Sequence, residues 1–356
     1  MIRERIEKIS DLLENNEAAL ITSGVNRLYL SGFNSSAGAV LVTKHKSYLF
    51  EDFRYFEKAS KTVKELEVIF TNKLYSQITD ILNGFGVKSI MIESESVTLK
   101  EFSAINKNLP DFNISASDEL SNALNDMRAV KTVDEIENIK KAQKLTDDTF
   151  SYILNFIKAG KTETEIALLM EFYMRKSGSE GASFDFIVVS GKNSSLPHGV
   201  PTDKPIEKGD LVTMDFGAVV NGYHSDMTRT VAVGNVTDEQ EKVYKTVLKA
   251  QEESLKAIKA GAVCKDIDKI ARDIIDSAGY KNCFGHGLGH SVGLEIHESP
   301  CLNTRDETRL KSGIIMTVEP GIYLADEFGV RIEDMVYVTD NGYDNLTAST
   351  KDLIIL

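Results

Sequence analysis

The sequence predicts an α+β protein that consists of a smaller N-terminal α/β domain and a larger C-terminal domain with two duplicated halves. Two observations predict this architecture. Residues 1–120 alternate between short apolar runs and amphipathic stretches, as α/β layers do. Residues 154–178 align without gaps on residues 255–279, which indicates a repeated structural unit. The chain of 356 residues is long enough for two cores, and we place the domains at 1–124 and 125–356.

The N-terminal domain is predicted to contain strands and helices in alternation. Amphipathic stretches that predict helices lie at residues 2–15, 53–65 and 73–84, and apolar runs that predict strands lie at residues 18–23, 37–42, 47–52 and 88–94. The only histidine of this domain is His45, which stands between two lysines and fits a solvated turn. We therefore expect no catalytic site from this part of the sequence.

The C-terminal domain is predicted to begin with a long helix. Its pattern runs from Thr132 to Ala159, with Thr132 and Glu135 spaced as a capping box and Gly160 as the C-terminal cap. Each copy of the repeat then has the order helix, glycine, helix, glycine, and each copy leads to a histidine segment. This order predicts two duplicated halves with a functional site where they meet.

Charge and cysteine content exclude several classes of function. With 54 acidic and 41 basic residues the formal net charge is -13, which disfavours nucleic acids and anionic membranes as partners. The sequence shows no apolar signal core and no apolar run that could span a bilayer, so we expect a cytoplasmic protein. Cys264, Cys283 and Cys301 lack the spacing of a zinc knot and are expected to be buried, inert thiols.

A predicted hairpin brings two aspartates together. Asn221-Gly222 between two β-rich runs indicates a two-residue turn, which pairs Val220 with Tyr223 and places Asp215 opposite Thr228. Asp226 is then a diagonal neighbour of Asp215, with the two backbones roughly 7–8 Å apart. The two carboxylates could bind one metal ion or a pair of ions. The alternative is an ordinary solvent-exposed acidic hairpin, although the apolar neighbours of Asp215 indicate a central strand.

Two further acids lie on apolar strands. Glu319 follows the run GIIMTV, and Glu333 shares a strand face with Arg331 in GVRIED. A structural ion pair between Arg331 and Glu333 is the simplest alternative to a functional role. If these acids join the aspartates and His290, the site offers many oxygens and one nitrogen, which favours Mn(II), Co(II) or Fe(II) over a structural zinc ion.

The segment FGHGLGHSVGLEIH, residues 284–297, contains three of the six histidines. Gly287 and Gly289 disfavour a helix here, and in an extended chain His286 and His290 would lie about 13 Å apart. One ion could not then bind both rings. We expect these histidines to divide into a metal ligand and proton-handling groups.

The five proposed ligands stand in the contexts MDFGA, HSDMTRT, HGLGH, TVEPG and RIED. In this order they resemble the ligand set of the pita-bread metallopeptidases, and most closely that of the Xaa-Pro branch, which comprises prolidase and aminopeptidase P. The resemblance covers nearly the whole chain, because residues 1–120 are similar to the creatinase-like N-terminal domain of that branch. It implies a pita-bread fold with pseudo-twofold halves in the C-terminal domain.

The resemblance also implies how two divalent ions would be bound. Asp215 would bind one ion, Asp226 and Glu333 would bridge the pair, and His290 and Glu319 would bind the other. A water or hydroxide that bridges the ions would be the nucleophile, with Glu319 as a proton carrier. Mn(II) is the expected metal, with Co(II), Fe(II) and Zn(II) as alternatives.

Further roles follow from the same resemblance. His198 and His297 would be catalytic histidines on the substrate side, which stabilise the tetrahedral intermediate and deliver a proton to the proline nitrogen. Arg331 would orient a ligand or bind the free carboxylate of a dipeptide. His286 is a candidate for a group behind the ligands, and His224 is either a polar wall residue or a substrate contact.

The implied function is hydrolysis of the Xaa-Pro bond of dipeptides by a homodimeric enzyme. The first alternative is an aminopeptidase P that releases the N-terminal residue from longer Xaa-Pro peptides, and the relatively short chain favours the dipeptidase. A non-catalytic pita-bread binding protein and a metal-free creatinase-like hydrolase are more distant alternatives. The five intact ligands disfavour both.

Overall fold

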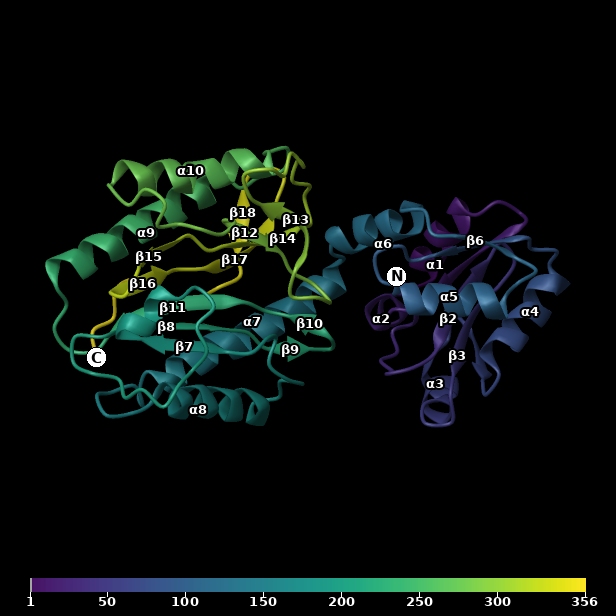
Figure 1. The fold of residues 1–356 in the computed structure, drawn as a ribbon, viewed down its shortest axis with the longest axis horizontal. Helices are drawn as coiled ribbons and strands as arrows, with labels where there is room; N and C mark the ends of the chain where they lie inside the picture. Colours follow the sequence, from purple (N-terminus) through teal and green to yellow (C-terminus); the bar gives the residue numbers. More distant parts are fainter. Residues whose placement is uncertain (1) are drawn as a thin grey trace. The chain divides into compact units, whose positions relative to one another are not determined.

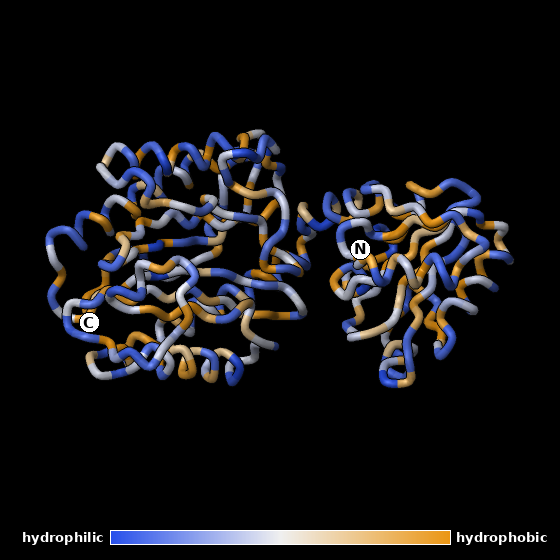
Figure 2. Tube along the Cα trace, viewed as in Figure 1, coloured by the Kyte–Doolittle hydropathy of each residue, from blue (hydrophilic) through white to orange (hydrophobic). Residues whose placement is uncertain are grey.

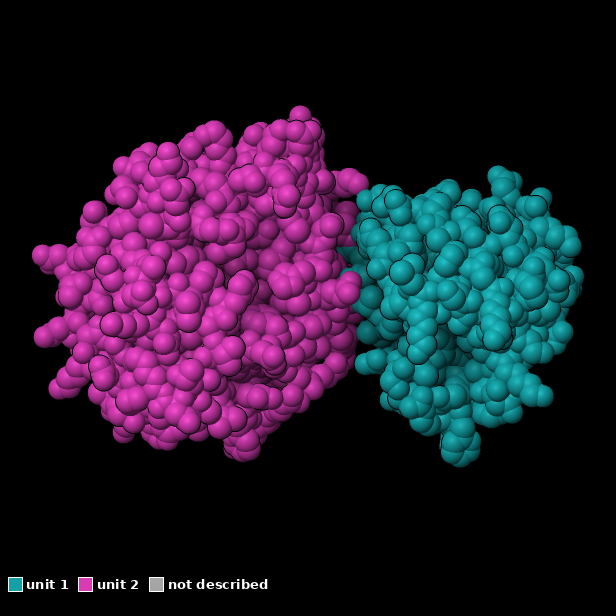
Figure 3. Space-filling view, in the orientation of Figure 1, with its two compact units in different colours: residues 1–128 teal, residues 129–356 magenta. Residues whose placement is uncertain are grey.

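The computed structural model describes residues 2–356 and divides into two compact units. One unit extends to Arg128, and the other is Ala129–Leu356 (Figure 3). The division falls in the last turn of helix α6 (Glu119–Ala129), about one helical turn after residue 124, where the sequence places the domain boundary.

The N-terminal unit is built on a six-stranded mixed sheet with the strand order β4-β3-β2-β1-β5-β6. The pairs β1–β2 and β2–β3 are antiparallel, and the other pairs are parallel. The strands are β1 (Glu17–Ile21), β2 (Ala39–Thr43), β3 (Ser47–Glu51), β4 (Glu67–Phe70), β5 (Ser89–Ile92) and β6 (Asn113–Ser115). The helices that precede α6 are α1 (Ile2–Leu12), α2 (Gly24–Ser31), α3 (Phe56–Thr62), α4 (Leu74–Gly84) and α5 (Leu99–Asn108).

The sequence located the buried part of this sheet but not its edges. The four predicted strands correspond to β1, β2, β3 and β5, in which nearly every residue is buried, and Figure 2 shows the hydrophobic stretches along them. The outer strands β4 and β6 are partly exposed, and their apolar runs are shorter, Val68-Ile69-Phe70 in β4 and Ile114 alone in β6. Burial on both faces explains why the central strands were recognisable.

In the C-terminal unit the strands lie between two helix pairs, α7 with α8 and α9 with α10 (Figure 1). The helices are α7 (Val133–Ile153), α8 (Glu163–Lys176), α9 (Asp238–Lys256) and α10 (Cys264–Ser277). The strands of the first half are β7 (Ile187–Ser190), β8 (Leu211–Phe216), β9 (Val219–Val220), β10 (Tyr223–His224) and β11 (Met227–Ala232), and a 3₁₀ helix, η1 (Gly191–Ser195), follows β7. The strands of the second half are β12 (Gly289–Ser291), β13 (Glu298–Leu302), β14 (Ile315–Val318), β15 (Gly321–Leu324), β16 (Phe328–Arg331), β17 (Asp334–Val338) and β18 (Tyr343–Asn345).

The predicted duplication of this unit is confirmed by its helices and glycines. Helices α8 and α10 begin at 163 and 264 and end at 176 and 277, which is the spacing of the sequence repeat at both ends. Gly160 and Gly261 have φ of 93° and 86°, and Gly178 and Gly279 have φ of 110° and 99°. Each half also has its own buried hydrophobic cluster. The repeat in the sequence is therefore a repeat in the fold.

Helix α7 is shorter than the sequence predicts. Its capping box between Thr132 and Glu135 is present, but the helix ends at Ile153 rather than at residue 159. Gly160 lies beyond an intervening turn and donates its N–H to the carbonyl of Ile206, at 2.9 Å, instead of capping the helix. The prediction of Gly160 as the helix cap is therefore wrong, because this residue bonds to a distant segment.

The cysteines differ in burial. Cys264 is buried as predicted, whereas Cys283 and Cys301 are only partly buried, because Cys283 lies in a loop and Cys301 on the edge strand β13. No helix within residues 2–356 has the length and apolar character needed to cross a bilayer.

Candidate metal centre

The hairpin register places Asp215 and Asp226 as the sequence predicts. Val220 pairs with Tyr223 and Asp215 with Thr228. Asn221 and Gly222 have φ of 50° and 78°, the left-handed backbone that a two-residue hairpin turn of this kind needs. The short side chain of asparagine and the absence of one in glycine make this turn possible.

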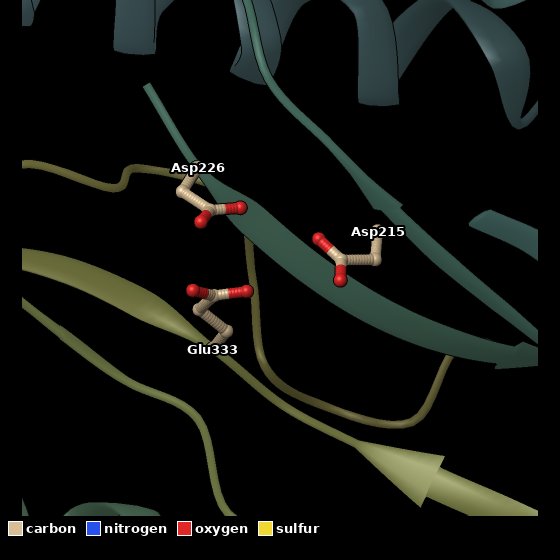
Figure 4. A group of neighbouring side chains, drawn as sticks. All are labelled: Asp215, Asp226 and Glu333. Carbon is tan, nitrogen blue, oxygen red and sulfur yellow. The ribbon is translucent and has the colours of Figure 1, made fainter. Parts of the chain in front are cut away.

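A third acid reaches this pair from the other half of the unit. Glu333 stands between β16 and β17, and its N–H donates to the carbonyl of Thr228 at 3.1 Å, which joins the two halves at this point. Oxygens of Asp215, Asp226 and Glu333 lie within 4.8 Å of one another, and all three residues are buried. Figure 4 shows the three carboxylates turned toward one another. The fold thus brings together acids that are more than 100 residues apart in the sequence.

Each of these acids has one buried oxygen without a hydrogen-bond partner, namely Asp215 Oδ1, Asp226 Oδ1 and Glu333 Oε1. Unpaired buried acceptors are costly, and three acids at this separation also repel one another. Burial, followed by the charges of neighbouring acids, raises the pKa of Asp226 and of Glu333 well above the usual range. Hard divalent cations prefer such a set of oxygens. The residues present therefore fit a bound divalent cation.

His290 offers a nitrogen on the edge of this cluster. Its Nδ1 lies 3.1 Å from the carbonyl of Ser291, which can only accept, so Nδ1 carries the hydrogen and Nε2 the lone pair. Nε2 faces Asp226 Oδ2 at 3.6 Å and Glu319 Oε1 at 3.4 Å. Burial, with a smaller contribution from His297, lowers the pKa of His290 to about 4. A neutral nitrogen that faces two carboxylates is the arrangement expected of a metal ligand.

Glu319 completes the group. Its side chain is 15% exposed, and Oε1 accepts a hydrogen bond of 3.1 Å from the hydroxyl of Thr317. Burial raises the pKa of Glu319 to about 8, against a smaller lowering by Arg331. Without a cation, this carboxyl group therefore holds a proton at neutral pH.

Arg331 is buried and forms its ion pair with Asp215, at 2.6 Å, rather than with Glu333. This corrects the alternative of a structural Arg331–Glu333 pair. The guanidinium group also donates to Thr228 Oγ1 at 3.0 Å, to the hydroxyl of Tyr323 at 2.8 Å and to the carbonyl of Pro197 at 3.2 Å. Since Thr228 Oγ1 donates to Glu333 Oε2 at 2.7 Å, Arg331 supports both acids, directly or through one hydroxyl.

The sequence did not single out Thr228 or Tyr323. Thr228 could have been found, because the predicted register places it opposite Asp215. Tyr323 has no such indication in the sequence. It lies on β15, which pairs with β16, and this pairing brings its hydroxyl to Arg331 on the neighbouring strand.

His286 lies behind the cluster. Its Nδ1 donates to the carbonyl of Gly287 at 2.8 Å, which leaves Nε2 to accept from the hydroxyl of Tyr323 at 2.8 Å. Burial, followed by the positive charge of Arg331, lowers the pKa of His286 to about 4. This ring therefore contacts the cluster only through Tyr323 and Arg331.

The remaining predicted histidines occupy different positions. His297 is exposed, and its ring centre lies 4.5 Å from that of His290. His198 is exposed and follows Pro197, whose carbonyl accepts from Arg331. His224 is half-buried and bonded to Ser183 Oγ at 2.9 Å, and burial lowers its pKa. His297 thus lies on the solvent side of His290 and His198 directly after a residue bonded to Arg331, whereas His224 is held by Ser183.

Comparison with known proteins identifies the family. Residues 137–340 match "Metallopeptidase family M24" and residues 5–130 match "Creatinase/Prolidase N-terminal domain". The chain belongs to metallopeptidase family M24 and has the creatinase/prolidase type of N-terminal domain. These matches confirm the predicted fold class of both domains and the prediction of a metallopeptidase.

Three relatives illustrate the similarity. The chain is 41% identical over 355 residues to "Uncharacterized peptidase YqhT" of Bacillus subtilis, which covers 99% of this chain and 100% of that protein. The structure of "Xaa-Pro dipeptidase from Bacillus anthracis" is 39% identical, with a TM-score of 0.95 and full coverage of both chains. The X-Pro aminopeptidase from Thermotoga maritima is 38% identical, with a TM-score of 0.91 and coverage of 98% and 99%.

Proposed function

We propose that this protein is a dinuclear-metal peptidase that hydrolyses the Xaa-Pro bond of dipeptides. The observation that carries the proposal is the set of three buried, unpaired carboxylate oxygens beside the lone pair of His290 Nε2. The similarity to a solved Xaa-Pro dipeptidase over the full chain supports the substrate class. The homodimer that the resemblance implies stays a prediction.

We assign five residues as ligands of two divalent ions, namely Asp215, Asp226, His290, Glu319 and Glu333. Four carboxylates and one imidazole favour Mn(II), and Co(II), Fe(II) and Zn(II) are the alternatives. When bound, the ions supply Lewis acidity, which polarises the scissile carbonyl and makes a water molecule a competent nucleophile at neutral pH. The charge of the cluster supports two ions rather than one, because within residues 2–356 the one arginine that is hydrogen-bonded to a ligand carboxylate, Arg331, is paired with Asp215.

Arg331 and Thr228 are proposed to hold the ligands in place. A ligand whose second oxygen is fixed by a hydrogen bond keeps its free oxygen in one direction. Asp215 Oδ2 is fixed by Arg331 and Glu333 Oε2 by Thr228, while the other oxygen of each acid stays unpaired. We therefore propose Arg331 as a positioning residue rather than as a group that contacts the substrate.

His198 and His297 are proposed to act on the substrate, because both are exposed, His297 lies against the ligand His290, and His198 follows a residue bonded to Arg331. An imidazole N–H can donate to the carbonyl oxygen of the scissile bond as that oxygen gains negative charge. The proline nitrogen leaves only after it accepts a proton, and an imidazole can deliver one near neutral pH. Glu319, whose Oε1 lies 3.4 Å from His290 Nε2, is proposed to carry a proton from the attacking water.

One observation favours aminopeptidase P as a second candidate. A dipeptidase must recognise the free carboxylate next to the cleaved bond, and an uncommitted cation would be the natural partner. The guanidinium group of Arg331 is already bonded to Asp215, Thr228, Tyr323 and Pro197. The solved X-Pro aminopeptidase that this chain resembles supports the same alternative.

The two candidates differ in the substrate that is cleaved faster. We expect the kcat/KM of the unmodified protein to be larger for an Xaa-Pro dipeptide than for the Xaa-Pro-Yaa tripeptide with the same first residue. Both values are measured in the presence of Mn(II), with an Xaa-Ala dipeptide as the control for proline selectivity. Faster cleavage of the tripeptide would assign the protein to the aminopeptidase P activity, and cleavage of neither would reject the proposed function.

A further inference from the structure

The segment that carries His198 is a loop of residues 191–201, here called the His198 loop, between β7 and Thr202. Within residues 2–356 the imidazole of His198 makes no hydrogen bond. Since no partner fixes the ring directly, its place depends on the backbone of the loop. The contacts that hold the loop therefore decide where this histidine stands.

Both ends of the His198 loop are bonded to one side chain, that of Glu163. Glu163 is the first residue of α8 and is fully buried, with an exposure of 0%. At the start of the loop, Oε1 accepts from the N–H and the hydroxyl of Ser190, at 2.6 and 2.9 Å. At its end, Oε2 accepts from the N–H and the hydroxyl of Thr202, at 3.1 and 2.7 Å. Asn193 Nδ2 donates to both oxygens, at 3.1 and 3.0 Å.

A carboxylate suits this arrangement better than any neutral side chain. It provides about four acceptor positions and no donor, and each of its partners here is an N–H or O–H donor. A buried charge is costly unless it is hydrogen-bonded in this way. The first turn of α8 also presents the positive end of the helix dipole to Glu163. The pattern of donors therefore fits a carboxylate at this position better than an amide, which would direct its own NH₂ at some of them.

The middle of the loop is fixed to the metal-ligand region. The carbonyl of Pro197 accepts from Arg331 at 3.2 Å, and Ser194 Oγ accepts from the N–H of Gly329 at 2.9 Å. Arg331 in turn pairs with Asp215. The loop is thus held at its two ends by Glu163 and at its middle by strand β16, with His198 directly after the residue that contacts Arg331.

The second half contains a similar device on the duplicated helix. Asp268 of α10 is fully buried, accepts from the N–H of Leu288 at 3.1 Å and pairs with Arg272. Arg272 donates to the carbonyls of Phe284 and His286. A buried acid of α8 and a buried acid of α10 therefore each hold the histidine segment of their own half.

We propose that Glu163 is a positioning residue for the reaction, which acts by fixing the His198 loop and thereby the place of His198 at the metal-ligand cluster. The inference rests on the proposed function, because it concerns the role of His198 in hydrolysis. Glu163 touches none of the proposed metal ligands. Its loss should consequently change turnover but leave metal binding unchanged.

The test is the substitution Glu163→Gln, which keeps the size of the side chain but directs an amide NH₂ at donors. Misplacement of a catalytic group costs up to roughly 100-fold, and we expect kcat/KM on an Xaa-Pro dipeptide to fall roughly 10- to 100-fold. The number of bound Mn(II) ions should not change. Glu171→Gln is the matched control, because Glu171 is a partly exposed residue of the same helix that pairs with Arg175.

A double-mutant cycle with His198→Ala separates positioning from a general loss of stability. If Glu163 acts through His198, adding Glu163→Gln to His198→Ala should lower kcat/KM by less than about twofold more. If the falls in kcat/KM caused by the two single substitutions instead multiply in the double variant, the proposal is overturned, because Glu163 then acts independently of His198.

Hydrogen exchange of the amides of Ser190 and Thr202 tests the clamp without any substrate. We expect at least tenfold faster exchange in Glu163→Gln and no change in Glu171→Gln, and unchanged exchange in Glu163→Gln would overturn the proposal. This result stands even if the protein acts on another substrate. If Glu163→Gln does not fold, Thr202→Val removes one hydroxyl donor and carries the same measurements, with smaller expected effects in the same directions and the same outcomes that would overturn the proposal.

Discussion

Asp215 and Asp226 come from the two strands of one hairpin, yet only Asp215 has a cationic partner. Its Oδ2 lies 2.6 Å from Arg331 Nη2, whereas the nearest basic group to Asp226 is the neutral ring of His290. Four acids with one arginine leave an excess of negative charge in a buried region, which is unfavourable without a cation. At the scale of single residues, the excess negative charge of the cluster therefore favours the binding of metal ions.

The partners of Arg331 decide what its removal should do. Because the guanidinium group holds Asp215 and is not free to bind a substrate carboxylate, Arg331→Met should lower kcat/KM for a dipeptide and for the matched tripeptide by the same factor. The loss of a buried charged pair is on the order of 2–5 kcal/mol in the transition state. A loss confined to the dipeptide would instead make Arg331 the receptor of the free carboxylate. Arg175→Met, on the exposed face of α8, is the control.

At the scale of secondary structure, the metal-ligand cluster depends on the two duplicated halves of the C-terminal unit, which meet at the cluster. Each copy of the repeat places a glycine with positive φ before its second helix, Gly160 before α8 and Gly261 before α10. The N–H of each glycine bonds to a distant strand or loop, at Ile206 and at Leu310 respectively. These glycines fix where the duplicated helices begin.

The repeated glycines should respond alike to substitution. An L side chain in this backbone region costs about 1–2 kcal/mol, and neither glycine has a neighbouring atom that an added Cβ would meet. Gly160→Ala and Gly261→Ala should therefore each lower the free energy of unfolding in urea by about 1–2 kcal/mol. Gly342→Ala, also in open space but without positive φ, should have little effect. Unequal losses at the two glycines would contradict the structural equivalence of the halves.

The sequence predicted those parts of the site that local rules determine. Asn221-Gly222 fixed the hairpin register, and hence the relation of Asp215 to Asp226, because the turn type has few solutions. The partner of Arg331 was not predictable in this way. Its pairing with Asp215 depends on how the strands of the two halves meet, and strand periodicity within GVRIED indicated only Glu333 as a neighbour.

The boundaries of helices and the positions of edge strands were likewise not predictable from the local sequence. The end of α7 at Ile153 and the edge strands β4 and β6 were missed, because burial against distant segments decides them rather than local pattern. The positions of Tyr323 and Glu163 relative to the histidines likewise arise from contacts over long sequence separations. The repeat itself was recognisable because each copy keeps its glycines at the same spacing.

At the scale of the whole molecule, the cluster couples folding to protons and to metal. The folded protein holds a proton on Glu319 up to about pH 8, whereas the unfolded chain loses it near its ordinary pKa of 4.5. The folded state therefore binds more protons in this range, and its stability falls as the pH rises through it. The lowered pKa values of His286 and His290 act in the opposite direction, but only below the ordinary value of 6.5.

Between pH 6.5 and 8 the raised pKa values of the acids, rather than the lowered pKa values of His286 and His290, make the stability depend on pH. In the presence of a chelator, the free energy of unfolding should fall by about 2 kcal/mol over this interval, at about 1.4 kcal/mol per pH unit for one retained proton. Urea unfolding at several pH values measures the slope. Glu319→Gln should make it smaller, since Asp226 and Glu333 also have raised pKa values, and Mn(II) should restore stability at pH 8. A metal-free protein whose stability rises over this interval would contradict the assignment.

The most direct test of the central claim is hydrolysis of an Xaa-Pro dipeptide before and after metal removal verified by elemental analysis. The proposed cluster predicts that chelation abolishes hydrolysis and that Mn(II) or Co(II) restores it, because the acids and His290 act by holding two ions. Asp226→Asn, which removes a proposed bridging charge, should prevent full restoration. Undiminished hydrolysis by protein that contains no metal would contradict the account.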